Sequence, residues 1–96
     1  MSAEAPSLRI DKYLWFVRLA PNRSSAQALA ERGIIRLNGR RIERAHVPVR
    51  VGDLITVPQG MAVRVIRVEK LPARRGPFAE AQLCYSAITP GIEPGP

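Results

Sequence analysis

The hydrophobic spacing of this sequence changes at Gly33, and that change constrains the fold more than any other feature. Before Gly33, the residues Ile10, Leu14 and Val17 recur at the interval of one helical face. After it, short runs rich in β-branched residues are separated by turns that contain glycine. We therefore predict an α+β fold, in which two short helices are followed by a small antiparallel sheet.

The first helix is predicted over residues 8–19. Ser7 is placed to act as its N-cap, and Pro21 follows its end, because proline cannot continue a helix. On a helix of this length, Arg9, Lys12 and Phe16 fall together on a face separate from the apolar stripe. One side of the helix is therefore basic and carries an aromatic ring that suits either the core or a nucleic-acid base.

The second helix is predicted in the segment NRSSAQALAERG. Two start signals compete there, because Asn22 is a favoured N-cap residue while Ser24 and Gln27 have the spacing of a capping box. Gly33 stands where a left-handed C-terminal cap is expected. A helix of about ten residues is marginal alone, so packing against the first helix must stabilise it.

The predicted sheet begins with a hairpin. An Asn38-Gly39 pair lies between the runs IIRL and RIE, and this pair is the strongest short signal for a two-residue turn between strands. Further strands are predicted at 54–57 and 61–68, with turns at 51–53 and 58–60. Apolar residues occupy both faces of the last strand, which a bulge near Val65 or Ile66 would reconcile.

The length of 96 residues fits one domain with a small core. Composition divides the chain into a flexible arm, a folded domain, a loop with a short segment that packs back on the domain, and a disordered tail rich in Pro and Gly. These four parts are predicted at 1–7, 8–70, 71–88 and 89–96.

The charge of the chain is strongly positive. Its net charge is +7, from 15 Lys and Arg against 8 Asp and Glu, and only Lys12 and Lys70 among the basic residues are not arginine. Arginine pairs with phosphate through a planar fork and stacks on bases, so this bias favours a nucleic-acid partner over solubility alone. The arginines are dense between residues 23 and 50, over the second helix and the hairpin. Those around the rigid turn repel one another unless an anion bridges them.

Other classes of function find little support in the sequence. No Ser-His-Asp order, phosphate-binding glycine loop or metal-ligand spacing occurs, so no enzyme, metal site or cofactor is predicted. The single cysteine, Cys84, excludes an internal disulfide and is expected to be a small buried hydrophobe. No apolar run is long enough to span a membrane and no secretion signal precedes the domain, so a cytoplasmic protein is expected.

In order and spacing, three stretches of the chain resemble a known family. LRIDKYL, then RLAPNRSSAQALAERGIIRLNGRR, then VRVGDLITV follow the pattern of the S4 RNA-binding domain from about Leu8 to Val57. Within that family, the DKYLWFVRL helix and the late segment RRGPFAEAQLCY resemble the branch of ribosome-associated heat-shock proteins of fifteen kilodaltons. The resemblance implies an α-L motif, in which two helices pack on a small sheet.

The resemblance also implies a function. It is that of a non-catalytic protein that binds structured ribosomal RNA on the large subunit, during the recycling of stalled ribosomes or under heat stress. Transfer RNA is a further implied partner, and a monomer is expected. Residues that match the RNA-contacting positions of the family are Arg9, Lys12, Arg23, Ser24, Gln27, Arg36, Asn38, Arg40 and Arg41. Two alternatives stay open: a general binder of DNA and RNA, and an accessory that targets a separate RNA-modifying enzyme.

Overall fold

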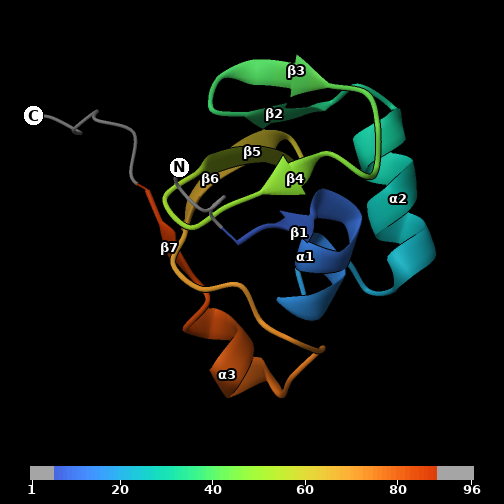
Figure 1. Ribbon diagram of the computed structural model, residues 1–96. Helices are drawn as coiled ribbons and strands as arrows, with labels where there is room; N and C mark the ends of the chain where they lie inside the picture. The colour runs from blue at the N-terminus through green and yellow to red at the C-terminus, as the bar shows by residue number, and fades with distance from the viewer. Residues whose placement is uncertain (1–5, 89–96) are drawn as a thin grey trace, which may run out of the picture.

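The computed structural model of the protein describes residues 6–88, so the greater part of the predicted arm and the whole predicted tail lie outside the described residues. In chain order the elements are β1 (Leu8–Arg9), α1 (Ile10–Phe16), α2 (Arg23–Glu31), β2 (Ile35–Leu37), β3 (Arg40–Ile42), β4 (Pro48–Val49), β5 (Leu54–Gln59), β6 (Ala62–Val68), α3 (Phe78–Gln82) and β7 (Tyr85–Ala87). Figure 1 shows α1 and α2 side by side, with the hairpin of β2 and β3 at one end of the molecule and α3 at the other. The predicted α+β class is confirmed.

An antiparallel sheet of 5 strands, in the order β3-β2-β5-β6-β7, forms the centre of the fold, while β1 and β4 pair separately. The predicted hairpin is confirmed, since Asn38 and Gly39 connect β2 to β3 with φ angles of 53° and 85°. Both angles lie in the left-handed region that a tight hairpin turn requires. Strand β2 also pairs with β5, which builds the hairpin into the sheet.

The first helix is shorter than predicted. Leu8 and Arg9 form strand β1 opposite β4, so α1 begins at Ile10, and the cap position is occupied by Arg9 rather than Ser7. The backbone amide of Ile10 donates to the carbonyl of Val47 at 2.9 Å, which continues that pairing into the first helical turn. The pairing partner lies some forty residues along the chain, where local helix signals carry no information about it.

The helix also ends earlier, at Phe16. Arg18 follows with a φ of 65°, a conformation that non-glycine residues rarely adopt. The guanidinium of Arg75 donates to the carbonyl of Trp15 at 2.6 Å and to that of Ala20 at 3.4 Å, and Arg18 donates from Nε to the carbonyl of Gly76 at 2.7 Å. The carbonyl of Trp15, near the end of α1, therefore accepts from the distant Arg75 as well as from the backbone amide of Arg18 at 3.1 Å.

The second helix follows one of its two start signals. The side chain of Asn22 accepts a hydrogen bond from the amide of Ser25 at 2.8 Å, so Asn22 is the N-cap and the predicted capping box of Ser24 and Gln27 does not form. Gln27 instead donates to Glu31, one turn further along, at 3.3 Å. Gly33 has a φ of 75° just beyond the helix, which confirms the predicted left-handed cap.

Strands β5 and β6 correct two predictions. β5 continues through Pro58 and Gln59, where a turn was predicted, and the chain turns at Gly60 and Met61. The register then runs one-to-one from Gln59 opposite Ala62 to Leu54 opposite Arg67, so the predicted bulge is wrong. Both faces of β6 are apolar because Ile66 and Val68 enter the core while Val63 remains 67% exposed on the other face.

The hydrophobic core joins the helices, the sheet and the C-terminal segment. Tyr13, Leu14 and Ala30 from the helices are buried in the same cluster as Ile35 and Ile55 of the sheet. Ala81 and Cys84 belong to this cluster too. The hydroxyl of Tyr13 donates to the carbonyl of Cys84 at 2.7 Å, inside the protein. Strand β7, which pairs with β6, was missed by the sequence prediction.

Within the described residues, the longest helices are too short to cross a membrane.

Candidate nucleic-acid interface

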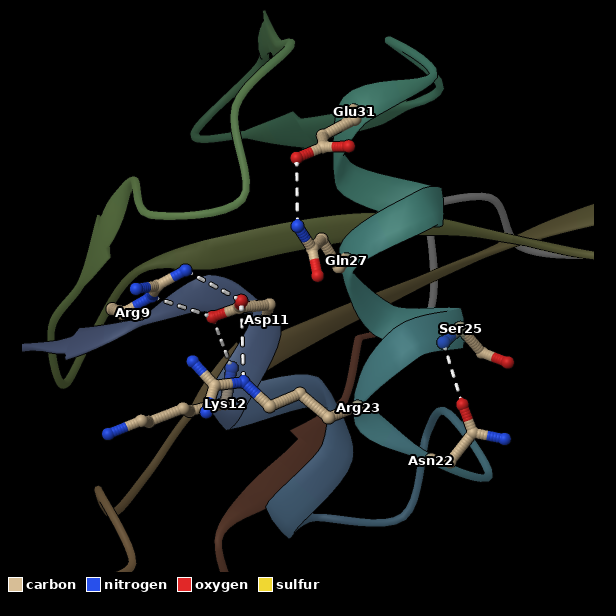
Figure 2. Close-up of polar contacts among 8 residues, drawn as sticks. All are labelled: Arg9, Asp11, Lys12, Asn22, Arg23, Ser25, Gln27 and Glu31. Carbon is tan, nitrogen blue, oxygen red and sulfur yellow. Dashed lines mark hydrogen bonds and ion pairs between the residues drawn. The ribbon is translucent and has the colours of Figure 1, made fainter.

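A buried carboxylate organises the basic residues at the start of α1. Asp11 has no exposed surface, yet its side chain is held by two arginines from different elements (Figure 2). Arg9 donates to its two oxygens from Nε at 3.0 Å and from a terminal nitrogen at 2.9 Å, in the side-by-side geometry typical of strong arginine–carboxylate pairs. Arg23, at the start of α2, places its Nε 3.7 Å from the same carboxylate.

The carboxylate is also tied to the backbone. The amide of Lys12 donates to Asp11 Oδ1 at 2.7 Å, which uses one of the free N–H groups of the first helical turn. The side chain of Lys12 extends away from the carboxylate in Figure 2. We call Arg9, Lys12 and Arg23 together the Asp11 cluster. The cluster has three positive groups for the one carboxylate of Asp11, so it keeps an excess of positive charge.

The arginines of the Asp11 cluster remain partly accessible. The side chains of Arg9 and Arg23 are 44% and 41% exposed, whereas that of Asp11 is covered completely. Each guanidinium carries five N–H groups, and the contacts to Asp11 use only some of them. The others are available to an anion at the surface. An arginine that is already held in place loses little rotational freedom when it binds.

One face of α2 continues this surface. Arg23, Gln27 and Glu31 follow one another at intervals of four residues, and Figure 2 shows Gln27 and Glu31 on the side of α2 that lies toward Arg9 and Asp11. Ser24 is exposed near the start of the helix. Glu31 accepts a hydrogen bond from Gln27, so the row changes from positive at the start of α2 to negative near its end.

The hairpin arginines do not all point the same way. Arg36 lies directly opposite Arg41 across the two strands, and Arg40 lies opposite Leu37. Because successive side chains of a strand leave on opposite faces, Arg36 and Arg41 share the face away from the core residues Ile35 and Ile42, while Arg40 leaves on the other face. The three hairpin arginines are therefore divided between two faces.

Two of these arginines have partners within the hairpin. Arg41 pairs with Glu43 at 2.7 Å, and both side chains are 61% exposed, so the pair is weak and solvent-screened. Arg36 donates weakly to the carbonyl of Gly39 at 3.4 Å. Arg41 and Glu43 lie against Gly33, just after α2. The Asp11 cluster and the hairpin arginines thus lie near opposite ends of α2, a helix of 9 residues that is about 13 Å long.

Asn38 is mainly a structural residue in this arrangement. Its amide nitrogen donates to Asp53 Oδ1 at 3.1 Å and its oxygen accepts from the amide of Leu54 at 2.9 Å. These bonds tie the hairpin turn to the start of β5. Asn38 was predicted as a contact residue, whereas its bond to Asp53 was not predicted.

Asp11 is the residue that the sequence analysis missed. The signal that marks it is an acid between two basic residues in the stretch RIDK, at the start of the predicted first helix. Cys84 is buried, as expected, and burial raises the pKa of its thiol. His46 is exposed, and Phe16 is half-buried beside Trp15. Among the described residues, no group of three His, Cys, Asp or Glu is placed to hold a metal ion.

Comparison with known proteins identifies a family and two related sequences. Residues 8–55 match the family model described as the S4 domain. Heat shock protein 15 of Escherichia coli (strain K12) is 30% identical over 89 residues, which cover 93% of this chain and 66% of that protein, so the chain spans slightly less than two thirds of this relative. Small ribosomal subunit protein uS4 of Nitratidesulfovibrio vulgaris (strain DSM 19637 / Miyazaki F) is 39% identical over 72 residues, which cover 71% of this chain and 34% of that protein.

A solved structure is also similar. Heat shock protein 15 of Vibrio cholerae gives a TM-score of 0.80 at 34% identity, over 86% of this chain and 83% of that one. That protein is described as trimeric, whereas a monomer was expected for this chain.

Proposed function

The chain belongs to the S4 domain family, and from that premise we propose that it is a non-catalytic RNA-binding protein that associates with the ribosome. The observation that carries the proposal is the Asp11 cluster, in which two half-exposed arginines from separate elements are fixed beside each other at the start of two helices. Such a surface suits the phosphates of a folded RNA. The net charge of +7 adds a general attraction for polyanions.

The expected mode of recognition is by shape and backbone. Double-helical RNA hides its bases in a deep and narrow major groove, so a protein reads mostly phosphates and 2′-hydroxyl groups. We propose that the Asp11 cluster and the exposed face of α2 lie along the RNA backbone, with Ser24 and Gln27 supplying neutral hydrogen-bonding groups. The hairpin residues Arg36, Arg40 and Arg41 add contacts from two faces.

The finer part of the proposal concerns the RNA itself. Relatives of this chain are named as a heat shock protein and as a protein of the small ribosomal subunit, and these names support ribosomal RNA as the target. We propose a site on the large subunit, in the recycling of stalled ribosomes or under heat stress, with transfer RNA as a second contact. Cross-linking in cells followed by identification of the recovered RNA tests this part.

Binding in solution tests the central proposal. Fluorescence anisotropy is measured with a large-subunit RNA hairpin, a small-subunit RNA fragment, a transfer RNA and duplex DNA of equal length, each over a range of salt. With roughly four to six phosphate contacts, log affinity should fall against log salt with a slope of about −3 to −5. Binding that is indifferent to salt would exclude the proposed interface.

A general nucleic-acid binder is the second candidate. It is favoured by the division of the hairpin arginines between two faces, which places positive charge around the molecule as well as at the Asp11 cluster. In that case duplex DNA competes with RNA at equal concentration and fixed salt. If the protein instead binds the RNA hairpin about ten times more tightly than duplex DNA, or better, the result supports the proposed RNA-binding function.

A further inference from the structure

We infer that Asp11 is a positioning residue for RNA binding: its buried carboxylate holds Arg9 and Arg23 together so that both reach one stretch of RNA backbone. This inference rests on the proposed function and goes beyond it. A buried carboxylate beside the basic residues of a polyanion-binding surface is unexpected from charge alone, since it repels phosphate. The contacts of Asp11 explain why it lies among these basic residues.

The first step concerns the origin of the two arginines. Arg9 precedes α1 and Arg23 begins α2, so their guanidinium groups come from elements that are separated by a loop. Without a common partner, two adjacent positive groups repel each other and spread into solvent. Asp11 is that partner, at 2.9 Å from Arg9 and 3.7 Å from Arg23.

The second step concerns the rigidity of the carboxylate. Asp11 is completely buried, and the amide of Lys12 fixes one of its oxygens at 2.7 Å. Arg9 donates to both oxygens, and these two hydrogen bonds restrict the rotation of its guanidinium relative to the carboxylate. Arg9 is therefore ordered before RNA arrives, so ordering it costs little of the binding free energy, while the ion pair at 3.7 Å holds Arg23 near the same carboxylate.

The third step concerns the N–H groups of Arg9 and Arg23 that do not contact Asp11. Arg9 uses Nε and one terminal nitrogen on Asp11, which leaves N–H groups on its other side. Its side chain is 44% exposed and that of Arg23 is 41% exposed, so these groups can meet solvent or phosphate. With Lys12, the cluster keeps an excess of two positive charges over its one carboxylate. Asp11 thus orients the positive charge without neutralising it.

The substitution Asp11→Asn separates this role from a simple charge effect. It removes one negative charge, and electrostatics alone would then strengthen RNA binding. If Asp11 positions the arginines, affinity for the RNA hairpin falls by about tenfold, and the salt slope becomes shallower by about 1 to 2, because contacts to phosphate are lost. Circular dichroism and thermal unfolding show whether the variant is folded at the assay temperature.

A matched control is available on α3. Glu80 is also paired with an arginine, Arg74, at 3.7 Å, but it lies outside the proposed interface and its side chain is 62% exposed. Glu80→Gln changes the net charge by the same amount as Asp11→Asn. Its RNA affinity is expected to equal or slightly exceed that of the wild type. A loss as large as that of Asp11→Asn would overturn the inference.

Two further variants extend the test, and the first of them keeps the inference testable if Asp11→Asn does not fold. Arg9→Lys retains the charge but cannot grip the carboxylate with two parallel hydrogen bonds, so affinity should fall severalfold. Combining Arg9→Gln with Arg23→Gln removes the groups that Asp11 orients, and adding Asp11→Asn to this background should then change affinity by less than about twofold. Unchanged affinity in Arg9→Lys, or an undiminished effect of Asp11→Asn in that background, would contradict the inference.

The outcomes also separate the inference from the proposed function. A wild-type protein that fails to bind any of the RNAs in a salt-dependent manner overturns the proposed function. A wild-type protein that binds RNA, together with a folded Asp11→Asn variant that binds as tightly or more tightly, overturns only the role of Asp11.

Discussion

The turn at Asn38 provides a sharp test of how the hairpin is built. Its φ of 53° is costly for most residues, and its side chain makes hydrogen bonds at 3.1 Å to Asp53 and 2.9 Å to Leu54. Replacing it by alanine removes both bonds, at about 0.5 to 1 kcal/mol each for an exposed site, and adds about 1 kcal/mol of backbone strain. Asn38→Ala should therefore lower the free energy of unfolding by about 2 to 3 kcal/mol.

Asn38→Gly separates the two contributions. The glycine variant loses the same hydrogen bonds but adopts the positive φ without strain. Its free energy of unfolding should therefore exceed that of the alanine variant by up to about 1 kcal/mol, and the greater backbone entropy of glycine in the unfolded chain reduces this difference. Urea unfolding followed by circular dichroism measures both variants. Because the turn survives, Asn38→Gly should keep RNA affinity within about threefold of the wild type. An Asn38→Ala variant as stable as the wild type, or a glycine variant less stable than the alanine one, would refute this reasoning.

Three further predictions address the hairpin, the core and the cysteine. Arg40→Glu together with Arg41→Glu should abolish RNA binding while the melting temperature stays nearly unchanged, and unchanged affinity would remove the hairpin from the interface. Tyr13→Phe deletes the buried hydrogen bond to the Cys84 carbonyl, which keeps its bonds from the amides of Glu69 and Lys70, so melting should fall by about 4 to 8 °C, and no shift would argue against the bond. Because burial raises the pKa of Cys84, iodoacetamide at pH 8 should modify the folded protein much more slowly than the urea-unfolded one, and equal rates would contradict its burial.

Signals that act over a few residues were sufficient for much of the fold. The Asn-Gly pair specified the hairpin, and Gly33 specified the end of α2, because both depend on backbone conformations that few other residues tolerate. Whether α2 begins at Asn22 or at the capping box of Ser24 could be decided only from the structure, since either start is locally acceptable. Sequence order and spacing also identified the family.

Predictions that depend on distant partners failed. The start of α1 is set by the pairing of Leu8 with Val49, and the distant Arg75 contacts the carbonyl of Trp15 near its end, so helix propensity alone gave too long a helix. For the same reason β6 was assigned a bulge, because the pattern alone does not reveal which of its two apolar faces enters the core. The link between Arg23 and Asp11 is also long-range, and so the charge pattern located the basic residues without showing what orders them.

The bonds between Arg75 and the end of α1 bear on where this protein can be divided. The family match ends at residue 55, yet the carbonyls of Trp15 and Ala20 are completed by a side chain twenty residues beyond that boundary, and the hydroxyl of Tyr13 by the backbone of Cys84. A fragment that ends at the family boundary contains the proposed contact residues. It lacks the hydrogen bonds that Arg75 and Cys84 make with the first helix and the loop after it. Anyone who transplants this module to another protein needs to carry the segment through β7 with it.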